Sequence, residues 1–474
     1  MKSSTEDGSW IQKELSQANF SDVRLNNRFS ILSEQLASQP SLPINQASLD
    51  WAASKAAYRF FENEKVSPEA IIAPHIKSTE SRLQKGQKII VVQDTTVLDF
   101  SKHWATLDLG PIAESRSGAE LHGLFMHTTM AMSEKGLPLG LLDNNIWARK
   151  PRKIKGHGHT KIPLEEKESF KWFKGLRASG SLAKKQEVVM VCDREADIYE
   201  LFEEAGDLNI DLVVRMNHDR ITCTEDHEYL KITDELGLKK YLSTKVVVEV
   251  PGSGRRKPRQ AELSIRFSPI TLSSQPRGIK TSRVKNRYDI ELQVVELHEL
   301  KPPKGEKALV WYLVSSLDVT NRSEALEVMR IYKLRWQIEQ YFKCLKTGCK
   351  IEDCRLNTAN KLMNYISLMS VVAWRLLWMT HLRRANPNLS CEVALTKNEW
   401  KALWLQRHKR QIKSGKLKAM PPKKPPNIGE AIKWIAMQGG FLGRKGDGDP
   451  GLITIWRGWL RLEGAAEIYA MLKN

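Results

Sequence analysis

The spacing of hydrophobic residues changes several times along this chain of 474 residues. Between about residues 10 and 75, apolar positions such as Phe29, Leu32 and Leu36 recur three to four apart, which is the period of an α-helix. The polar stretch "SQPSLPINQAS" at 38–48 separates this pattern from a second helical piece, "WAASKAAYRFFENE". The amino-terminal region is therefore predicted to be a small helical module.

Short, nearly continuous apolar runs rich in Ile and Val replace the helical period after residue 80. The runs are "KIIVVQD" (88–94), "EVVMVCD" (187–193) and "DLVVRMN" (211–217), and "LHGLFMHTTMAMS" and "LPLGLLDNNIWA" are two further strand candidates. Such runs are typical of strands buried on both faces, and the segment "PLEEKESFKWFKGLRAS" between them has helical spacing. The pattern predicts an α/β fold around a central mixed sheet.

In the last part of the chain, apolar and polar residues first alternate and then follow the spacing of a helix. Alternating segments from about residue 240 to 316, such as "KVVVEVPG" and "DIELQVVELHE", predict a mainly β section. Beyond Arg355 the chain is predicted to be helical, apart from a Pro- and Lys-rich linker at 410–427. The domains expected from these changes are residues 1–72, which are helical, residues 73–374, which form the mixed core, and residues 375–474, which are again helical.

Composition adds a strong basic charge. The chain has 74 Lys and Arg residues and 55 Asp and Glu residues, so its formal net charge is +19. Such an excess favours polyanions, because binding to phosphates releases condensed counterions. Nucleic acid is therefore the leading partner, and a soluble enzyme with a merely basic surface is the alternative.

No segment predicts a membrane role. The most apolar stretch, residues 362–379, contains several polar residues, Arg375 among them, and this suits a buried helix better than a membrane span. The amino end lacks the pattern of a signal peptide, so a cytoplasmic protein is expected. The six cysteines form no CxxC pair and are expected to be reduced, and His157 and His159 in "GHGHT" fit a polar loop better than a metal site.

Two aspartates stand where ligand groups gather in α/β proteins. Asp94 and Asp193 each close an apolar run, and the carboxyl ends of strands in open α/β sheets are common ligand sites. If the two strands are neighbours, the carboxylates meet. Two structural alternatives stay open: Asp193 can cap the helix predicted after it, and Asp94 can shape a turn with the threonines that follow.

One helix face collects four further polar groups in "YKLRWQIEQYFKCLKTG". At 100° per residue, Tyr332, Arg335, Glu339 and Lys346 fall within a sector of about 60°, along roughly 20 Å of helix. An ordinary alternative is that Glu339 pairs with Lys343 at i+4 on a solvated surface.

These motifs together carry a family resemblance. "VVQDTTVLDF", "VVMVCDREADIY", "EKESFKW", "KPPKGE" and the spacing of Tyr332, Arg335, Glu339 and Lys346 resemble the bacterial cut-and-paste DDE transposases of the insertion-sequence-four family, most of all its Tn-five branch. The similarity runs nearly from end to end, and the motifs are specific in combination.

The resemblance implies a ribonuclease-H-like catalytic core with the β-rich section as an insertion, flanked by a DNA-binding helical domain and a helical dimerisation domain. It implies that Asp94, Asp193 and Glu339 are the catalytic, metal-binding triad. Three carboxylates suit Mg²⁺ or Mn²⁺, and two such ions serve in-line phosphoryl displacement. The partners implied are the inverted-repeat ends of a transposon and target DNA, bound by a homodimer, without a small-molecule cofactor.

Roles for further residues also follow from the resemblance. Tyr332, Arg335 and Lys346 are expected to hold phosphates, and Trp311 and Trp336 to receive a flipped base, with core packing as the alternative for both tryptophans. The residues expected to bind the end sequence are Arg24, Arg28, Tyr58, Arg59, Arg215, His218, Arg355, Asn357 and Lys361. Basic segments at 149–155 and 254–259, with Arg220, are candidates for backbone contacts.

The chain also departs from the family pattern. Leu25 stands where the Tn-five branch has another arginine, and Asn357 stands where that branch has an acidic residue. The implied activity is metal-dependent nicking at a transposon end, hairpin formation, hairpin opening and joining to target DNA. Two other functions stay open: a nuclease of this fold without strand transfer, and an inactive DNA-binding or inhibitory protein.

Overall fold

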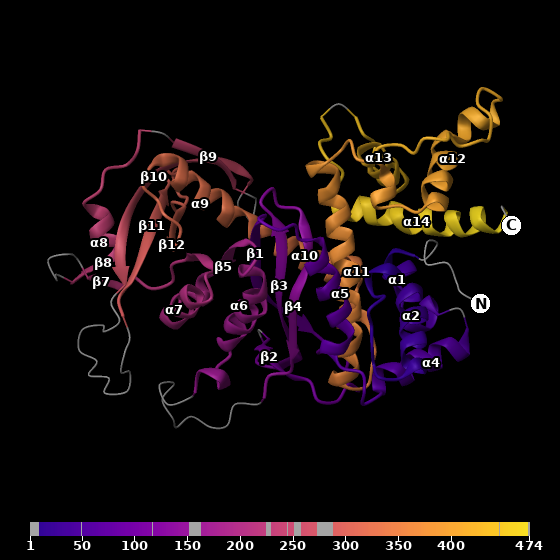
Figure 1. Cartoon of the computed structure of the whole chain (residues 1–474), viewed down its shortest axis with the longest axis horizontal. Coiled ribbons are helices and arrows are strands. Elements are labelled where there is room, and N and C mark those ends of the chain that lie inside the picture. Colours follow the sequence, from indigo (N-terminus) through magenta and orange to yellow (C-terminus); the bar gives the residue numbers. More distant parts are fainter. Residues whose placement is uncertain are drawn as a thin grey trace. The chain divides into compact units, whose positions relative to one another are not determined.

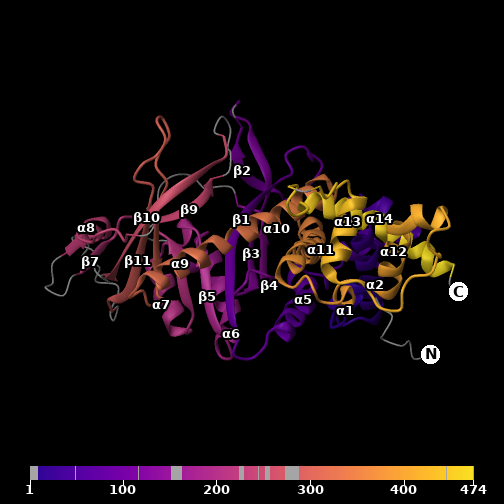
Figure 2. The same cartoon turned by 90° about the horizontal axis from the view of Figure 1, so that it is seen from above.

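The structure is a computed structural model of the chain, in which residues 9–48, 50–115, 117–150, 163–223, 229–243, 245–250, 257–272, 288–444 and 446–472 are described. The chain divides into two compact units (Figure 1, Figure 2). Unit 1 contains Met1–Leu83, Thr95–Gly156 and Gln337–Asn474, and unit 2 contains Gln84–Asp94 and His157–Trp336. The "GHGHT" loop, residues 151–155 and residues 254–256 of the predicted basic segments lie outside the described residues.

The sheet of unit 2 begins parallel and ends antiparallel. β1 (Lys88–Asp99), β5 (Glu187–Cys192) and β6 (Asp211–Arg215) run parallel in that order. Antiparallel pairing then continues from β6 to β12 (Val310–Ser315), β11 (Ile290–His298) and β10 (Arg259–Leu272). β9 (Lys245–Val250) and β7 (Ile221–Cys223) both pair with β10, and β8 (Tyr229–Lys231) pairs with β7. The predicted β section thus extends the parallel core.

Helices cover both faces of the unit 2 sheet. α9 (Arg322–Leu334) packs against β5, β6, β11 and β12, α6 (Phe170–Ala183) packs on β5, and α7 (Tyr199–Asp207) packs on β6. Figure 1 shows α9 on one side of these strands and α6 and α7 on the other. The short helices of unit 2 are η2 (Leu164–Glu166), η3 (Arg194–Ala196) and α8 (Ile232–Gly237).

Unit 1 has its own strands. β1 enters this unit at Thr95, and β3 (Glu120–Ser133) pairs antiparallel with β2 (Gly110–Glu114) and β4 (Pro138–Trp147). A Cβ atom on Gly123 would lie 2.0 Å from the carbonyl oxygen of Leu98 in β1. Glycine at this position therefore lets β3 approach β1 closely.

One long buried helix, α11 (Ala359–Ala385), organises the helices of unit 1. Within the described part of the chain it is the single helix long and apolar enough to cross a membrane, but 83% of its most apolar window is buried in the protein. Its polar Asn364 donates hydrogen bonds to the carbonyl oxygens of Phe61 and Val66, at 3.0 and 3.1 Å. The prediction of a buried helix at 362–379 is therefore confirmed.

The other helices of unit 1 lie before and after α11 in the chain. The earlier ones are α1 (Trp10–Glu14), α2 (Val23–Ser38), α3 (Ile44–Ala47), α4 (Trp51–Glu62), α5 (Pro68–Arg82) and α10 (Trp336–Lys343), whose first residue belongs to unit 2, with η4 (Cys344–Gly348) and η5 (Ile351–Asp353). The later ones are η6 (Cys391–Val393), α12 (Lys397–Lys413), α13 (Ile428–Gln438) and α14 (Leu452–Met471).

Two glycines let α13 and α14 cross with their backbones in contact. A Cβ atom on Gly439 would lie 1.8 Å from the carbonyl oxygen of Thr454, and one on Gly458 would lie 1.7 Å from that of Ile435. No larger side chain fits at this crossing, which fixes how the last helices pack.

A buried ionic network joins α1 to α5 and β4. Arg82 donates two hydrogen bonds to the Glu14 carboxylate, at 2.7 and 3.0 Å, and His75 Nδ1 lies 2.6 Å from the same carboxylate. The backbone N–H of Leu141 donates to His75 Nε2, so this nitrogen carries no proton and His75 is neutral. Burial opposes ionisation of Glu14, but the hydrogen bonds from His75 and Arg82 and the positive charge of Arg82 lower the Glu14 pKa to about 2.

The predicted fold class is confirmed: the protein is α/β, with a mixed parallel and antiparallel sheet, a β-rich section and helical segments at both ends of the chain. Three details differ from the sequence patterns. β1 continues to Asp99 and does not end at Asp94. The break at 38–48 contains the short helix α3, and the start of the predicted linker at 410–427 is the end of α12. The five cysteines with described side chains are free and buried, as expected for reduced thiols.

Candidate active site

Asp94 and Asp193 occupy equivalent positions on neighbouring parallel strands of unit 2. The last paired residues of β1 and β5 are Val92 and Val191, and each aspartate comes two residues later, Asp193 still in extended backbone. Side chains two apart on a strand point to the same face, and neighbouring strands lie about 4.8 Å apart. The structure therefore brings these two carboxylates together on one face.

The two carboxylates interact electrostatically. Burial, and then the negative charge of Asp94, raise the pKa of Asp193 above its usual value. Burial and the charges of both aspartates also raise the pKa of the neighbouring Cys192 thiol. Asp193 additionally caps η3 by accepting a hydrogen bond from the backbone N–H of Glu195 at 2.8 Å. The capping role that the sequence left open and the contact with Asp94 are thus both present.

Three guanidinium groups lie near this pair. Arg335 Nη1 donates to Asp94 Oδ2 at 2.6 Å, and the two side chains are only 17% and 15% exposed. Tyr332 forms hydrogen bonds with Arg335 and with Arg215, and burial raises its pKa and lowers that of Arg215. Arg194 also acts on Arg215, as a second positive charge that lowers its pKa. Strong donors therefore stand beside two acids, an arrangement that suits phosphate recognition next to a cation site.

The predicted single helix from Tyr332 to Lys346 is wrong in its geometry. α9 ends at Leu334, Arg335 sits at the junction with its N–H bonded to the Tyr332 carbonyl oxygen, and α10 begins at Trp336. The last turn, η4, is a π-helix. A constant rotation of 100° per residue therefore does not hold at the Arg335 junction or in η4. Arg335 and Glu339 are still four residues apart in helical backbone.

Glu339 and Lys346 belong to unit 1. Glu339 lies in the first turn of α10. The ammonium group of Lys346 donates to the Val97 carbonyl oxygen in β1 and lies 3.9 Å from Glu352. Lys346 thus ties the end of the helical segment to the strand that carries Asp94.

The two tryptophans differ in environment. The Trp311 ring, on β12, meets the Tyr332 ring edge to face with centroids 5.9 Å apart. Trp336 is 51% exposed. The contact of Trp311 with a buried tyrosine favours the packing role for this residue, whereas the exposure of Trp336 leaves an aromatic face accessible.

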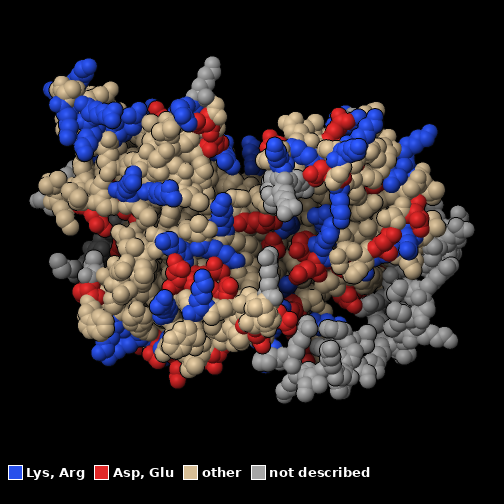
Figure 3. Space-filling model, turned by 180° about the vertical axis from the view of Figure 1, so that it is seen from behind, with Lys and Arg blue, Asp and Glu red and all other residues tan. Residues whose placement is uncertain are grey.

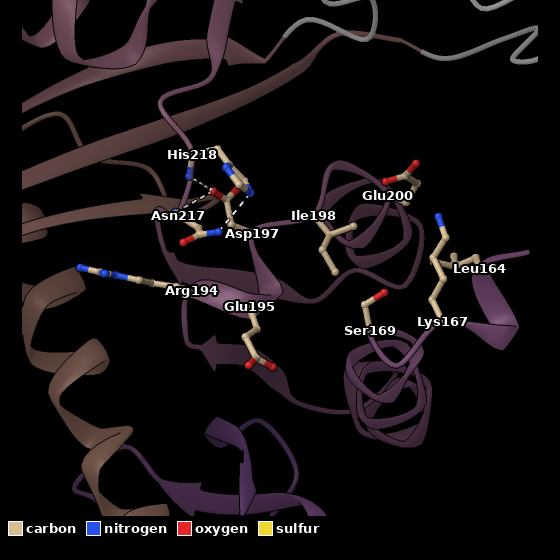
Figure 4. Close-up of a pocket in the computed structure, with 10 residues that line it drawn as sticks. All are labelled: Leu164, Lys167, Ser169, Arg194, Glu195, Asp197, Ile198, Glu200, Asn217 and His218. Carbon is tan, nitrogen blue, oxygen red and sulfur yellow. Dashed lines mark hydrogen bonds between the residues drawn. The ribbon is translucent and has the colours of Figure 1, made fainter. Parts of the chain in front are cut away.

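A cavity of about 360 Å³ opens in unit 2, lined in part by residues of η3 and of the loop after β6 (Figure 4). Its lining includes Arg194, Asn217 and His218. The buried Asp197 accepts the backbone N–H groups of Asn217 and His218 at 2.8 and 3.0 Å, and also the Nε of Arg220 at 2.7 Å. Figure 4 shows Asp197 beside Asn217 and His218. His218 therefore lines this cavity, while Arg220 holds the loop that carries it.

Apart from Arg215 and His218 of unit 2, the residues expected to bind the end sequence are spread over several elements of unit 1. Arg24 and Arg28 lie on α2, and Tyr58 and Arg59 lie on α4; both Arg24 and Arg59 are exposed. Burial raises the pKa of Tyr58.

A second group precedes α11. Arg355 and Asn357 are exposed, and Lys361 donates to Asn357 Oδ1 at 2.9 Å and lies 3.0 Å from Glu62 of α4. The ion pair with Glu62 connects this group to α4.

Trp104 was not singled out by the sequence patterns and is 93% exposed. Its loop is joined to the residues after Arg355: Thr106 Oγ1 donates to the Leu356 carbonyl oxygen, and the N–H of Leu107 donates to that of Asn357, each at 2.9 Å. A tryptophan inside a polar loop, "SKHWATLD", is the one signal in the sequence that could have identified it.

Asp94 and Asp193 fit a divalent cation by their chemistry. Both are hard oxygen donors on one face, and Asp94 raises the pKa of Asp193, as expected where a positive ion relieves repulsion. Among the described residues, no group of three or more His, Cys, Asp and Glu side chains has metal-binding geometry.

Three family models match the chain. They are described as "Transposase DNA-binding", over residues 7–66, "Transposase DDE domain", over residues 174–375, and "Transposase Tn5 dimerisation domain", over residues 371–469. A solved structure, the cryo-EM structure of the piggyBac transposase synaptic complex with hairpin DNA, is 12% identical, covers 88% of this chain and 82% of its own, and has a TM-score of 0.35. That TM-score is too low to carry an argument, so the family assignment rests on the three models.

Proposed function

Because this chain belongs to the DDE transposases of the Tn5 type, we propose that it cuts DNA at the inverted-repeat ends of a transposon and joins them to target DNA. The observation that carries the proposal is the pair Asp94 and Asp193, in register on parallel strands with Arg335 bound to one of them. Buried, repelling carboxylates are costly to a fold, and a cation-dependent active site gives them a purpose.

Glu339 completes the catalytic triad in this proposal. It follows Arg335 by four residues in helical backbone, and Arg335 is bound to Asp94. DDE transposases depend on a divalent metal. The three carboxylates of this chain would hold Mg²⁺ or Mn²⁺, two ions per site, which activate the attacking oxygen and stabilise the leaving oxygen.

Arg335, Tyr332 and Lys346 hold the phosphates beside the scissile bond. Arg335 donates to Asp94, and a phosphate offers the same guanidinium a stronger bidentate partner. Tyr332, which bonds both Arg215 and Arg335, keeps the two guanidinium groups oriented. Trp336, with its exposed face, receives the base that leaves the stack when the hairpin forms, and Trp311 packs against Tyr332.

End recognition uses the surface of unit 1. Arg24, Arg28, Tyr58 and Arg59 contact the end from α2 and α4, where the DNA-binding model matches. Arg355, Asn357 and Lys361 form a second contact region, which Trp104 extends, because its loop donates hydrogen bonds to the carbonyl oxygens of Leu356 and Asn357. Arg215 and His218 contribute from unit 2.

The reaction takes four steps. Water first cleaves one strand at the transposon end and leaves a 3′-OH, which attacks the opposite strand and forms a hairpin. Hydrolysis reopens the hairpin, and the 3′-OH then attacks a target phosphodiester. The carboxy-terminal region pairs two copies of the chain, in agreement with the dimerisation match at 371–469. Such a protein works in the cytoplasm, on the nucleoid.

One experiment separates this function from its alternatives. The purified protein is incubated with a labelled transposon end, a supercoiled target plasmid and Mg²⁺. A transposase yields end-to-plasmid joined products as well as cleaved ends. Cleaved ends without joined products would support a nuclease, and binding without cleavage would support an inactive DNA-binding protein.

A further inference from the structure

The end of α12 and the linker that follows are strongly basic and contain no acid. Between Glu399 and Glu430 the sequence has no Asp or Glu. We call residues 407–424 the basic arm. Its cations are all exposed: Arg407, Lys409, Arg410, Lys413, Lys416, Lys418, Lys423 and Lys424.

The arm starts from a fixed base. Trp400 and Leu403 of α12 are buried, and the His408 ring lies between Trp404 and Trp434, with centroids 4.4 and 5.8 Å away. Gln406 accepts a hydrogen bond from Gln438 of α13. The helix is therefore held on one face while its cations point elsewhere.

The charges of the arm are not neutralised within the part of the chain that the structure describes. None of the eight cations forms an ion pair with a described residue. Figure 3 shows Lys and Arg gathered at the upper left, over the end of α12 and the linker after it. The arm is therefore a surface with a net positive field.

Local helix stability does not account for this pattern. The negative end of the helix dipole stabilises cations in the last turn of α12, but that effect falls off within one turn. Lys416, Lys418, Lys423 and Lys424 lie beyond the helix end at Lys413. Like charges at i+3, as at Arg407 and Arg410, and at i+4, as at Lys409 and Lys413, also repel each other.

We propose that the basic arm binds the phosphate backbone of target DNA, without regard to sequence. The proposal rests on the transposase function proposed above and assigns the binding of target DNA to this surface. From Arg407 to Lys413 the helix rises about 9 Å, which matches two to three phosphates along one strand at about 3.4 Å each. A basic segment without any acidic residue suits a partner whose sequence varies, because every phosphate backbone carries the same charge.

The test compares two variants in which the same number of positive charges is removed. In the arm variant, Lys416, Lys418, Lys423 and Lys424 are changed to Gln. In the control, the exposed Lys184, Lys185, Lys239 and Lys240 of unit 2 are changed to Gln. Binding of a duplex that lacks the end sequence is measured across salt concentrations, and joining is measured with pre-cleaved ends and a limiting target plasmid.

Removing one lysine that neutralises a phosphate reduces the slope of log K against log salt by about 0.9. The arm variant is expected to show a slope smaller by up to about 3.6 and a joining rate at least tenfold lower at limiting target, with end cleavage unchanged. The control should keep the wild-type slope. Equal effects in both variants, or an unchanged slope in the arm variant, would overturn the proposal. If the wild type itself neither cleaves nor joins, the transposase function fails, whereas the binding comparison still decides whether the arm holds duplex DNA.

Discussion

Replacing Asp193 with Asn removes one of two neighbouring negative charges and leaves the local structure intact. Asn is as good an N-cap as Asp, so it still accepts the backbone N–H of Glu195. The side chain also keeps its size, so no cavity forms. The substitution therefore isolates the repulsion between Asp94 and Asp193.

The size of the effect follows from the strand pairing. Two unit charges about 5 Å apart repel by about 3 kcal/mol at an effective dielectric constant of about 20. Arg335 is bound to Asp94 and offsets part of this repulsion. The variant is therefore expected to be more stable than the wild type by about 1–3 kcal/mol at neutral pH without divalent ions.

The pH dependence has a definite sign. The pKa of Asp193 is raised in the folded protein, so the folded state holds its proton more firmly than the unfolded state. The repulsion is absent in acid and grows as the pH rises through the raised pKa. The higher stability of the Asp193→Asn variant relative to the wild type should therefore disappear at low pH.

Urea unfolding in EDTA measures this difference, with the exposed Asp318→Asn as a control expected to change stability by less than about 0.5 kcal/mol. Adding Mg²⁺ should stabilise the wild type more than Asp193→Asn, because an ion bound by the folded state alone shifts the equilibrium. A variant that is less stable than the wild type in EDTA, while the control is neutral, would refute the electrostatic reasoning.

Three other predictions can be checked separately. Trp336→Ala should slow hairpin formation by roughly tenfold to a hundredfold and leave first-strand nicking nearly unchanged, as denaturing gels can resolve, because base stacking on an aromatic ring is worth about 1–3 kcal/mol; equal slowing of both steps would contradict a role for Trp336 in receiving the base. Trp104→Ala should weaken binding to a transposon end by roughly tenfold in gel-shift titration without lowering the unfolding midpoint, because the side chain is 93% exposed, and Trp104→Phe should restore most of the binding. Glu14→Gln should cost about 3 kcal/mol of stability at neutral pH. The lowered Glu14 pKa, about 2, makes this contribution complete above the usual carboxylate pKa and lost as the pH falls towards 2, so the gap between wild type and variant in urea unfolding should narrow in acid.

The strands of the core could be predicted because each one carries a strong local signal. The runs that end near Asp94 and Asp193 are continuous, β-branched and bounded, and they became β1 and β5. The parallel pairing of these strands could only be assumed, because the pattern within a strand does not name its neighbour. The sequence places the end of β1 at Asp94 because the apolar run ends there, while pairing in unit 1 extends the strand to Asp99.

The helix before Glu339 shows where periodicity is insufficient. The positions of Tyr332 and Arg335 were correctly assigned to helical backbone, but the junction at Arg335 and the π-helical turn after Lys343 leave no mark in the pattern of apolar residues. Both depend on tertiary contacts, such as those of Arg335 with Asp94 and of Lys346 with Val97. Trp104 was missed for a related reason, since exposure is a property of the fold and not of the residue type.

The central claim, that Asp94, Asp193 and Glu339 act together, is tested most directly by Glu339→Gln. This change removes one carboxylate charge and almost no volume, and Glu327→Gln on the surface of α9 is a matched control. Cleavage of a labelled transposon end in Mg²⁺ is measured alongside end binding. We predict that Glu339→Gln binds the end like the wild type but cleaves it at least a hundredfold more slowly, whereas the control cleaves normally. Near-normal cleavage by Glu339→Gln in Mg²⁺ would contradict the triad.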